Sequence, residues 1–262
     1  PSKRIMDALI PDRPVALVSY DGHSLWVNSV ALERAGITKD TPDPDGGRIE
    51  RDPDTSEPSG VLRETAMNLI DKVIPDYSLE ERKNGLLAYQ EMAIRSGITM
   101  THDAMLDAGC IAAFNALAEE NKLIMRFRGS ITLDPNNEIG PQIEAVLTER
   151  SKNTHRYFQT NAAKIFVDGV LEGGTAYLFE PYAHRPDFRG EPIWDSELLN
   201  YTSVALDKEK LQIHVHVIGD AAAHITLDAL EQAQVMNGKR DSRHLVTHLQ
   251  LVKPEDIKRF KQ

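Results

Sequence analysis

The 262-residue chain has a single cysteine, Cys110, and no long apolar run. One cysteine excludes an internal disulfide framework and the zinc sites that are built from several cysteines. No apolar stretch reaches the ~18 residues of a membrane span, and no signal-peptide pattern opens the chain. A net charge of -10 argues against nonspecific binding to nucleic acid or acidic membranes. These absences predict a globular protein with neither kind of partner, and they are compatible with a cytoplasmic location, which we expect.

Both ends of the chain look internal to a longer protein. The first residue is Pro1 rather than methionine, and the last, Gln262, follows closely on the start of a helix. Pro254 lies near the first turn of that helix, and Glu255 and Asp256 lie at its positive end. We therefore expect further sequence on both sides.

The first part of the chain, residues 1–78, is rich in turn-forming residues. Residues 41–60 are dense in Pro, Gly and Asp, a composition that does not hold a long helix or strand. We predict that residues 1–78 form an irregular insertion or lid, and that residues 79–262 form the regular part of the domain.

Strands and helices alternate five times from about Ser78 onward. The predicted helices cover residues 78–97, 108–121, 137–151, 195–210 and 221–238, and the predicted strands cover residues 98–105, 123–133, 162–170, 211–220 and 242–252. This alternation favours an α/β fold with a parallel sheet and helices packed outside it.

Polar residues on one face of several strands distinguish a barrel from an open sheet. By strand periodicity, one face carries Lys164, Phe166 and Asp168, then Gln212, His214 and His216, then His244, Val246 and His248. The strands of an open sheet contact helices on both faces and tend to be apolar throughout. We therefore predict a TIM-like (β/α)8 barrel, incomplete in this chain and covering about strands 2–6, whose active site lies at the C-terminal strand ends. The alternative is an open α/β sheet with His214 and His216 as hydrogen-bonded core residues and a phosphate ligand at its switch point, but no glycine fingerprint supports it.

Lys164 and the strand histidines are the chemical candidates. A buried lysine is costly unless it is paired or neutralised. Lys164 could form an ion pair with Asp168 or another carboxylate, which the strand alone favours, or be carboxylated to an anionic metal ligand. His216 and His248 end neighbouring strands, which lie ~5 Å apart, so their imidazoles could share one metal ion. The three together shift the interpretation toward a metal site.

These residues lie in motifs that resemble a known family. The motifs, in chain order, are DGHSLWVNSVALERAGI, PSGVLRE, SGITMTHDAM, AKIFVDGV, HVIGDAAAHITLDALE and RHLVTHLQLV followed by PEDIKRF. The order resembles the branch of the amidohydrolase superfamily that includes N-substituted formamide deformylases and related metal-dependent hydrolases. The resemblance covers nearly the whole chain.

The resemblance implies a barrel around one or two divalent metal ions, usually zinc. By position, Lys164 would be a carboxylated, bridging ligand, and His216 and His248 would be ligands from the next two strands. His23 would lie near the substrate and His102 would line the pocket. We assign His214 and Asp168 to hydrogen bonding behind the ligands. Thr247 replaces an acidic residue that is often found before the last of these histidines.

The implied activity is hydrolysis of a small-molecule amide or formamide C–N bond by a metal-activated hydroxide. The strand-1 His-x-His pair of the family would lie before Pro1, and the general-base aspartate would lie beyond Gln262, so no residue of this chain is predicted as the base. The alternative is a catalytically inactive member with a regulatory or binding role. An incomplete barrel exposes sheet edges, so a homo-oligomer is a further expectation.

Overall fold

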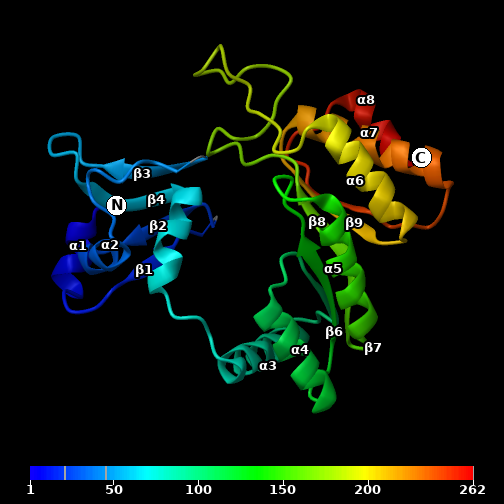
Figure 1. Cartoon of the computed structure of the whole chain (residues 1–262), viewed down its shortest axis with the longest axis horizontal. Helices are drawn as coiled ribbons and strands as arrows, with labels where there is room; N and C mark the ends of the chain where they lie inside the picture. The colour runs from blue at the N-terminus through cyan, green and yellow to red at the C-terminus, as the bar shows by residue number, and fades with distance from the viewer. Residues whose placement is uncertain (21, 45, 262) are drawn as a thin grey trace. The chain divides into compact units, whose positions relative to one another are not determined.

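The computed structural model describes residues 1–20, 22–44 and 46–261. The chain divides into two compact units, Pro1–Tyr77 and Ser78–Gln262. Each unit has a sheet of its own, and the two are described separately here (Figure 1).

The N-terminal unit is built on a four-stranded antiparallel sheet in the order β1-β2-β4-β3. Its strands are β1 (Ala16–Val18), β2 (Ser24–Val27), β3 (Gly47–Arg51) and β4 (Pro58–Glu64), and its helices are α1 (Lys3–Leu9), α2 (Ser29–Ala35) and the 3-10 helix η1 (Thr65–Val73). Val27, Leu32, Ile49, Leu62 and Ile70 form its buried core.

Residues 41–60 are more regular than their composition suggests. The Pro-, Gly- and Asp-rich residues 41–60 contain β3 and the start of β4, which pair as a hairpin. Asp52 organises the turn, because its carboxylate accepts hydrogen bonds from the backbone N–H groups of Asp54 and Thr55, both at 3.1 Å. The turn-forming composition therefore marks the hairpin connection rather than a lack of structure.

The C-terminal unit contains the predicted alternation of strands and helices. Its parallel strands are β5 (Met100–Asp103), β6 (Arg126–Thr132), β8 (Phe158–Phe166), β9 (Gln212–Val217) and β10 (Leu245–His248), and the short β7 (Thr154–His155) pairs antiparallel with β8. Its long helices are α3 (Leu79–Arg95), α4 (Ala108–Glu119), α5 (Ile139–Lys152), α6 (Ser196–Lys208) and α7 (Asp220–Asn237). All five predicted strands and all five predicted helices are confirmed.

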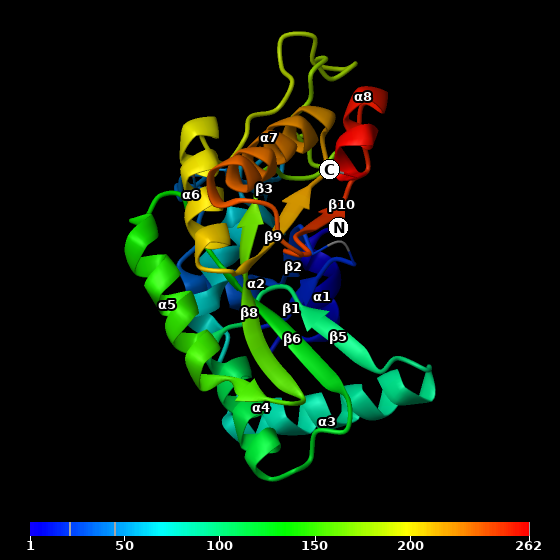
Figure 2. The ribbon, with the colours of Figure 1, turned by 90° about the vertical axis from the view of Figure 1, so that its right-hand side faces the viewer.

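The strand order tests for the switch point that the open-sheet alternative requires. The parallel strands follow one another as β5-β6-β8-β9-β10, in chain order and without the reversal that defines a switch point. The described strands therefore lack the switch point at which the open-sheet alternative places a phosphate ligand. Within the described residues, β5 and β10 are the two end strands and do not pair with each other, so this part of the chain forms a half-barrel (Figure 2).

Helices cover the outer face of the half-barrel. α5 packs on β8, and α6 and α7 pack on β9 (Figure 2). Ile165, Ile213 and Val215 point into this layer and are buried with α6 residues such as Leu199 and Leu206. A second cluster joins α4 to β6 and β8, where the rings of Phe114 and Phe158 stack with centroids 4.6 Å apart.

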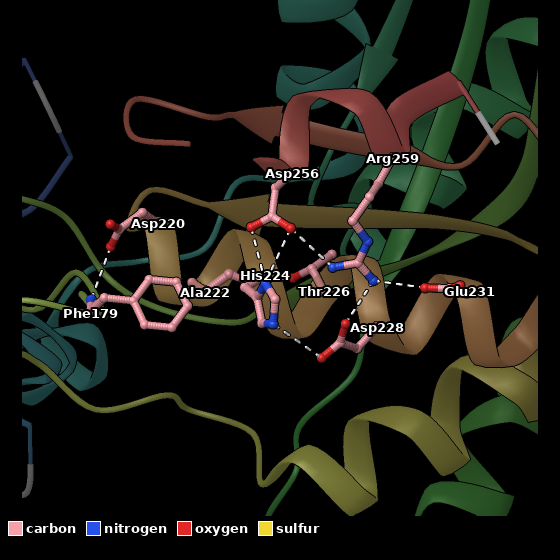
Figure 3. Close-up of polar contacts among 9 residues, drawn as sticks. All are labelled: Phe179, Asp220, Ala222, His224, Thr226, Asp228, Glu231, Asp256 and Arg259. Atoms are coloured by element: carbon pink, nitrogen blue, oxygen red, sulfur yellow. Dashed lines mark hydrogen bonds and ion pairs between the residues drawn. The ribbon is translucent and has the colours of Figure 1, made fainter. Parts of the chain in front are cut away.

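The C-terminal turn is fixed to α7 by a charged network (Figure 3). This turn consists of α8 (Pro254–Ile257) and the 3-10 helix η2 (Lys258–Lys261). Asp256 is almost fully buried, and its carboxylate bonds to His224 at 3.0 Å and to Arg259 at 3.1 Å. Arg259 also pairs with Asp228 and Glu231 of α7. The network ties the segment after β10 to the helix before it.

Among the described residues, none of the helices is both long and apolar enough to cross a lipid bilayer.

Candidate metal centre

Lys164, His214 and His216 lie on the inner face of the sheet, opposite the helix layer. The parallel register places Lys164 beside His214 and Phe166 beside His216. The three polar residues keep only 2%, 5% and 7% of their surface exposed. The strand periodicity that predicted a shared inner face for them is therefore matched by the pairing.

His248 reaches the same place by a route that the sequence did not reveal. The register pairs Val246 with Val215 and Thr247 with His216. Val246 packs against the outer core, so the expectation that it faces inward with His244 and His248 is wrong. His248 has a φ of 75°, which is outside the strand region, and its ring lies 4.5 Å from that of His216, centroid to centroid. By strand alternation, the His248 side chain would point outward, like that of Val246. The left-handed backbone conformation at His248 turns it to the inner face instead.

His244 and Thr247 are occupied by the backbone or by neighbouring elements. The Nδ1 atom of His244 accepts a hydrogen bond from the Ile213 N–H at 3.0 Å, and its Nε2 lies 3.3 Å from Asp207. The Thr247 hydroxyl donates to the Val215 carbonyl at 2.9 Å. None of these contacts involves His216 or His248.

Lys164 lies in this cluster without a carboxylate partner among the residues that the structure describes. Burial alone lowers its pKa from 10.5 to about 8. Its Nζ lies 4.7 Å from the ring centroid of Phe166, a weak compensation for the lost water. The ammonium also lowers the pKa of His214 and His248, after the larger effect of burial, which indicates that the three groups are close in space.

Asp168 does not form the ion pair with Lys164 that was one of the two interpretations. Its carboxylate accepts hydrogen bonds from the backbone N–H groups of Tyr177, Ile218 and Gly219, at 2.8–3.0 Å. Burial raises its pKa, and the three hydrogen bonds act in the opposite direction. Asp168 is therefore engaged by the loops at the C-terminal strand ends.

Ser130 forms hydrogen bonds with both His102 and His214, and the sequence did not predict this contact. Its buried hydroxyl lies 2.7 Å from His102 Nε2 and 3.0 Å from His214 Nδ1, and the two rings are 4.9 Å apart. Because a hydroxyl has one proton, it donates to one ring and accepts from the other. Burial lowers the pKa of His102 and is the main reason that the pKa of His214 falls to about 3. The sequence signal that could have revealed this contact is a serine within a strand that is predicted to be buried.

His23, the other predicted substrate contact, belongs to the N-terminal unit. Its Nδ1 lies 2.9 Å from Glu64 Oε2, and both side chains are about one-third exposed. Its role near a substrate stays a prediction.

His216 and His248, two of the three predicted ligands, lie side by side, and Lys164 lies near His248. Among the described residues, no group of three or more His, Cys, Asp or Glu side chains is arranged to hold a metal, so Lys164 would have to complete the set. The Gly169 carbonyl lies 2.9 Å from His216 Nε2 and can only accept, so this nitrogen carries the proton and Nδ1 of the neutral ring carries the lone pair. A metal-binding imidazole usually donates its other N–H to such a carbonyl.

The comparisons with known proteins identify the family. The model of the amidohydrolase family matches residues 1–262. The chain is 31% identical over 275 residues to the protein LONG AFTER FAR-RED 3 of Arabidopsis thaliana, covering 100% of this chain and 46% of that protein. It is 34% identical over 263 residues to the putative amidohydrolase YtcJ of Bacillus subtilis (strain 168), covering 98% and 47%.

Solved structures show a similar fold. The crystal structure of an uncharacterized metal-dependent hydrolase from Pyrococcus horikoshii OT3 matches with a TM-score of 0.69 at 22% identity, covering 100% of this chain and 49% of that one. The chain thus spans about half the length of the curated relatives and of the solved structure that it matches. The motifs, the half-barrel and the family match lead to one conclusion: the chain belongs to the amidohydrolase family.

Proposed function

We propose that this chain is part of a metal-dependent hydrolase that cleaves the C–N bond of a small amide or formamide-type molecule. One observation carries the proposal: Lys164 is buried without a carboxylate partner in the described part of the chain, on the face that also holds His216 and His248. A buried, unpaired amine lowers the stability of the fold, so its place calls for a chemical reason. The formamide class comes from the motif resemblance.

The three side chains would hold one or two ions, with zinc as the expected metal. A bound divalent ion would lower the pKa of its water to ~7 and polarise the scissile carbonyl. His216 would bind through Nδ1, because its Nε2–H is given to the Gly169 carbonyl. His248 would bind from the neighbouring strand, 4.5 Å away between ring centroids.

Lys164 would contribute as a carbamate. Its lowered pKa, about 8, leaves a larger fraction of neutral amine at pH 7 than an exposed lysine has. A neutral amine adds to carbon dioxide, and loss of one N–H proton leaves an anionic carbamate whose oxygens can bind metal. Carboxylation would thus replace a buried cation that destabilises the fold with an anionic ligand for a divalent metal ion.

The imidazoles around Ser130 would shape the pocket beside these ligands. His214 stays neutral because its pKa is about 3, so it can donate or accept one hydrogen bond without adding positive charge. His102 shares the Ser130 hydroxyl and would be available to a substrate on the β5 side. We expect His23 to contact the substrate as well.

Metal content and amide hydrolysis in the intact protein test the proposal. Metal would be measured by mass spectrometry, and turnover of N-formyl amines by amine release. We expect bound metal in the wild type, and at least ~100-fold loss of activity in Lys164→Ala, His216→Ala and His248→Ala, since removing even an indirect partner of a metal costs 10–100-fold. His184→Ala is the matched control, because His184 is an exposed histidine of the same unit.

A metal-free wild type whose activity survives both His216→Ala and His248→Ala would contradict the proposal. A folded protein that binds small molecules but hydrolyses no amide, formamide or ester would instead support the alternative, a family member with a binding or regulatory role.

A further inference from the structure

Asp168 connects two loops at the C-terminal ends of neighbouring strands. One of its carboxylate oxygens accepts the Ile218 N–H at 2.9 Å, and the other accepts the N–H groups of Gly219 at 2.8 Å and Tyr177 at 3.0 Å. Tyr177 belongs to the loop after β8, whereas Ile218 and Gly219 form the turn between β9 and α7. One side chain, 1% exposed, therefore fixes both loops.

The chemistry of this contact requires a carboxylate. Three backbone donors converge on two acceptor oxygens, and an ionised carboxylate has only acceptor sites. An asparagine would direct its NH2 group at one or two of these donors and leave them without a partner. A buried N–H without a partner costs ~1–3 kcal/mol, so the loops would have to move.

The next residue transmits this position to His216. The Gly169 carbonyl is the partner of His216 Nε2, at 2.9 Å. Gly169 is held in place by its own N–H, which donates to the Thr175 carbonyl at 3.1 Å, and a Cβ atom there would lie 2.0 Å from Thr175 Oγ1. At Gly219 a Cβ would lie 1.9 Å from the Tyr177 carbonyl oxygen. A Cβ atom fits at neither glycine, so the loop after β8 folds closely on itself at Gly169 and packs against the β9–α7 turn at Gly219.

We infer that Asp168 is a positioning residue of the metal centre. It holds the turn whose Gly169 carbonyl selects the Nε2–H tautomer of His216, and this tautomer directs the Nδ1 lone pair at the metal. The inference rests on the proposed function for the identity of His216 as a ligand. It assigns the effect to a residue that contacts neither the metal nor the substrate, and that acts through the next peptide group.

The test compares Asp168→Asn with Asp195→Asn in the intact protein. Asp195 is the matched control, because its carboxylate also accepts two backbone N–H groups, those of Glu197 and Leu198, at the start of α6. Zinc affinity would be measured by competition with a chromogenic chelator. We expect Asp168→Asn to bind zinc ~10–100-fold more weakly, as is usual when a ligand loses its indirect support, and Asp195→Asn to stay within about twofold of wild type.

A second readout separates positioning from a general loss of structure. In the metal-free protein, 15N-histidine NMR reports which ring nitrogen of His216 carries the proton. We expect the Nε2–H tautomer in the wild type and in Asp195→Asn, and a mixture of tautomers in Asp168→Asn. A folded Asp168→Asn protein with wild-type zinc affinity and a pure Nε2–H tautomer would overturn the inference.

The remaining outcomes also decide the question. If Asp168→Asn does not fold, Asp168→Glu, which keeps the charge and moves the oxygens, replaces it with the same expectations. An Nδ1–H tautomer in the wild type overturns the inference without any variant. If the wild type binds no zinc, the proposed function fails, and the tautomer comparison alone then supports or rejects the coupling of Asp168 to His216.

Discussion

The two faces of β8 and β9 are almost equally buried and chemically opposite. Ile165, Ile213 and Val215 point outward under the helices and are at most 1% exposed. Lys164, His214 and His216 alternate with them, point inward and are 2–7% exposed. Burial alone therefore does not separate the stabilising residues from those of the proposed site. The difference lies in what burial does to each: it stabilises an isoleucine and destabilises an unpaired amine.

The largest expected effect on stability breaks the outer face. Ile213→Ala removes a fully buried side chain from the layer under α6 and α7 and should lower the free energy of unfolding by ~2–4 kcal/mol. Urea unfolding would measure the change. Ile257→Ala is the control, because Ile257 is 58% exposed, and should stay within ~0.5 kcal/mol of wild type. Zinc affinity of the folded Ile213→Ala protein should be unchanged, and equal losses in the two variants would contradict the assignment of this face.

Replacing Lys164 of the inner face with an apolar residue should have a smaller effect. This change should raise the free energy of unfolding rather than lower it. The pKa of Lys164 is lowered to about 8, so at pH 7 the folded protein holds this ammonium less favourably than the unfolded chain does. Lys164→Met should therefore stabilise the metal-free protein by ~1–3 kcal/mol while abolishing its metal affinity. Lys152→Met, at a lysine whose side chain is 60% exposed, should stay within ~0.5 kcal/mol of wild type. A Lys164→Met protein less stable than wild type would show that the amine is satisfied.

The smallest effect concerns His244, a largely buried histidine just before β10 that lies outside the proposed site. Burial is the main reason that its pKa is lowered, so the folded state keeps it neutral while the unfolded chain takes up a proton near pH 6.5. Its contribution is complete above about pH 6.5 and is lost as the pH falls toward the folded pKa, by at most ~1.4 kcal/mol per pH unit. His244→Gln should flatten the decline in unfolding free energy between pH 7 and 5. An unchanged slope would mean that other groups account for it.

Periodicity was sufficient to predict the strands, the helices and the inward position of Lys164, His214 and His216, because these residues lie in regular strands with one apolar face. It failed at Val246, which packs outward, and it placed His248 on the inner face for the wrong reason, because a positive φ and not the strand phase sets the direction of that side chain. Periodicity also could not identify the partners of Asp168. Its carboxylate accepts hydrogen bonds from three backbone N–H groups of two loops and does not pair with the nearby Lys164. Ser130 was missed because a hydroxyl between two histidines 112 residues apart is a tertiary contact.

The uninterrupted order of the parallel strands also has a consequence for how the chain folds. Among the described parallel strands, each one after β5 pairs with the parallel strand before it, so the sheet can grow by one strand and one helix at a time, with partners separated by a single crossover. Growth of this kind can follow synthesis from the N-terminus. Lys164, His216 and His248 come from three consecutive parallel strands and meet once β8, β9 and β10 have paired. If these three residues form the proposed site, acquisition of metal-binding capacity during refolding would report the pairing of β10 with β9.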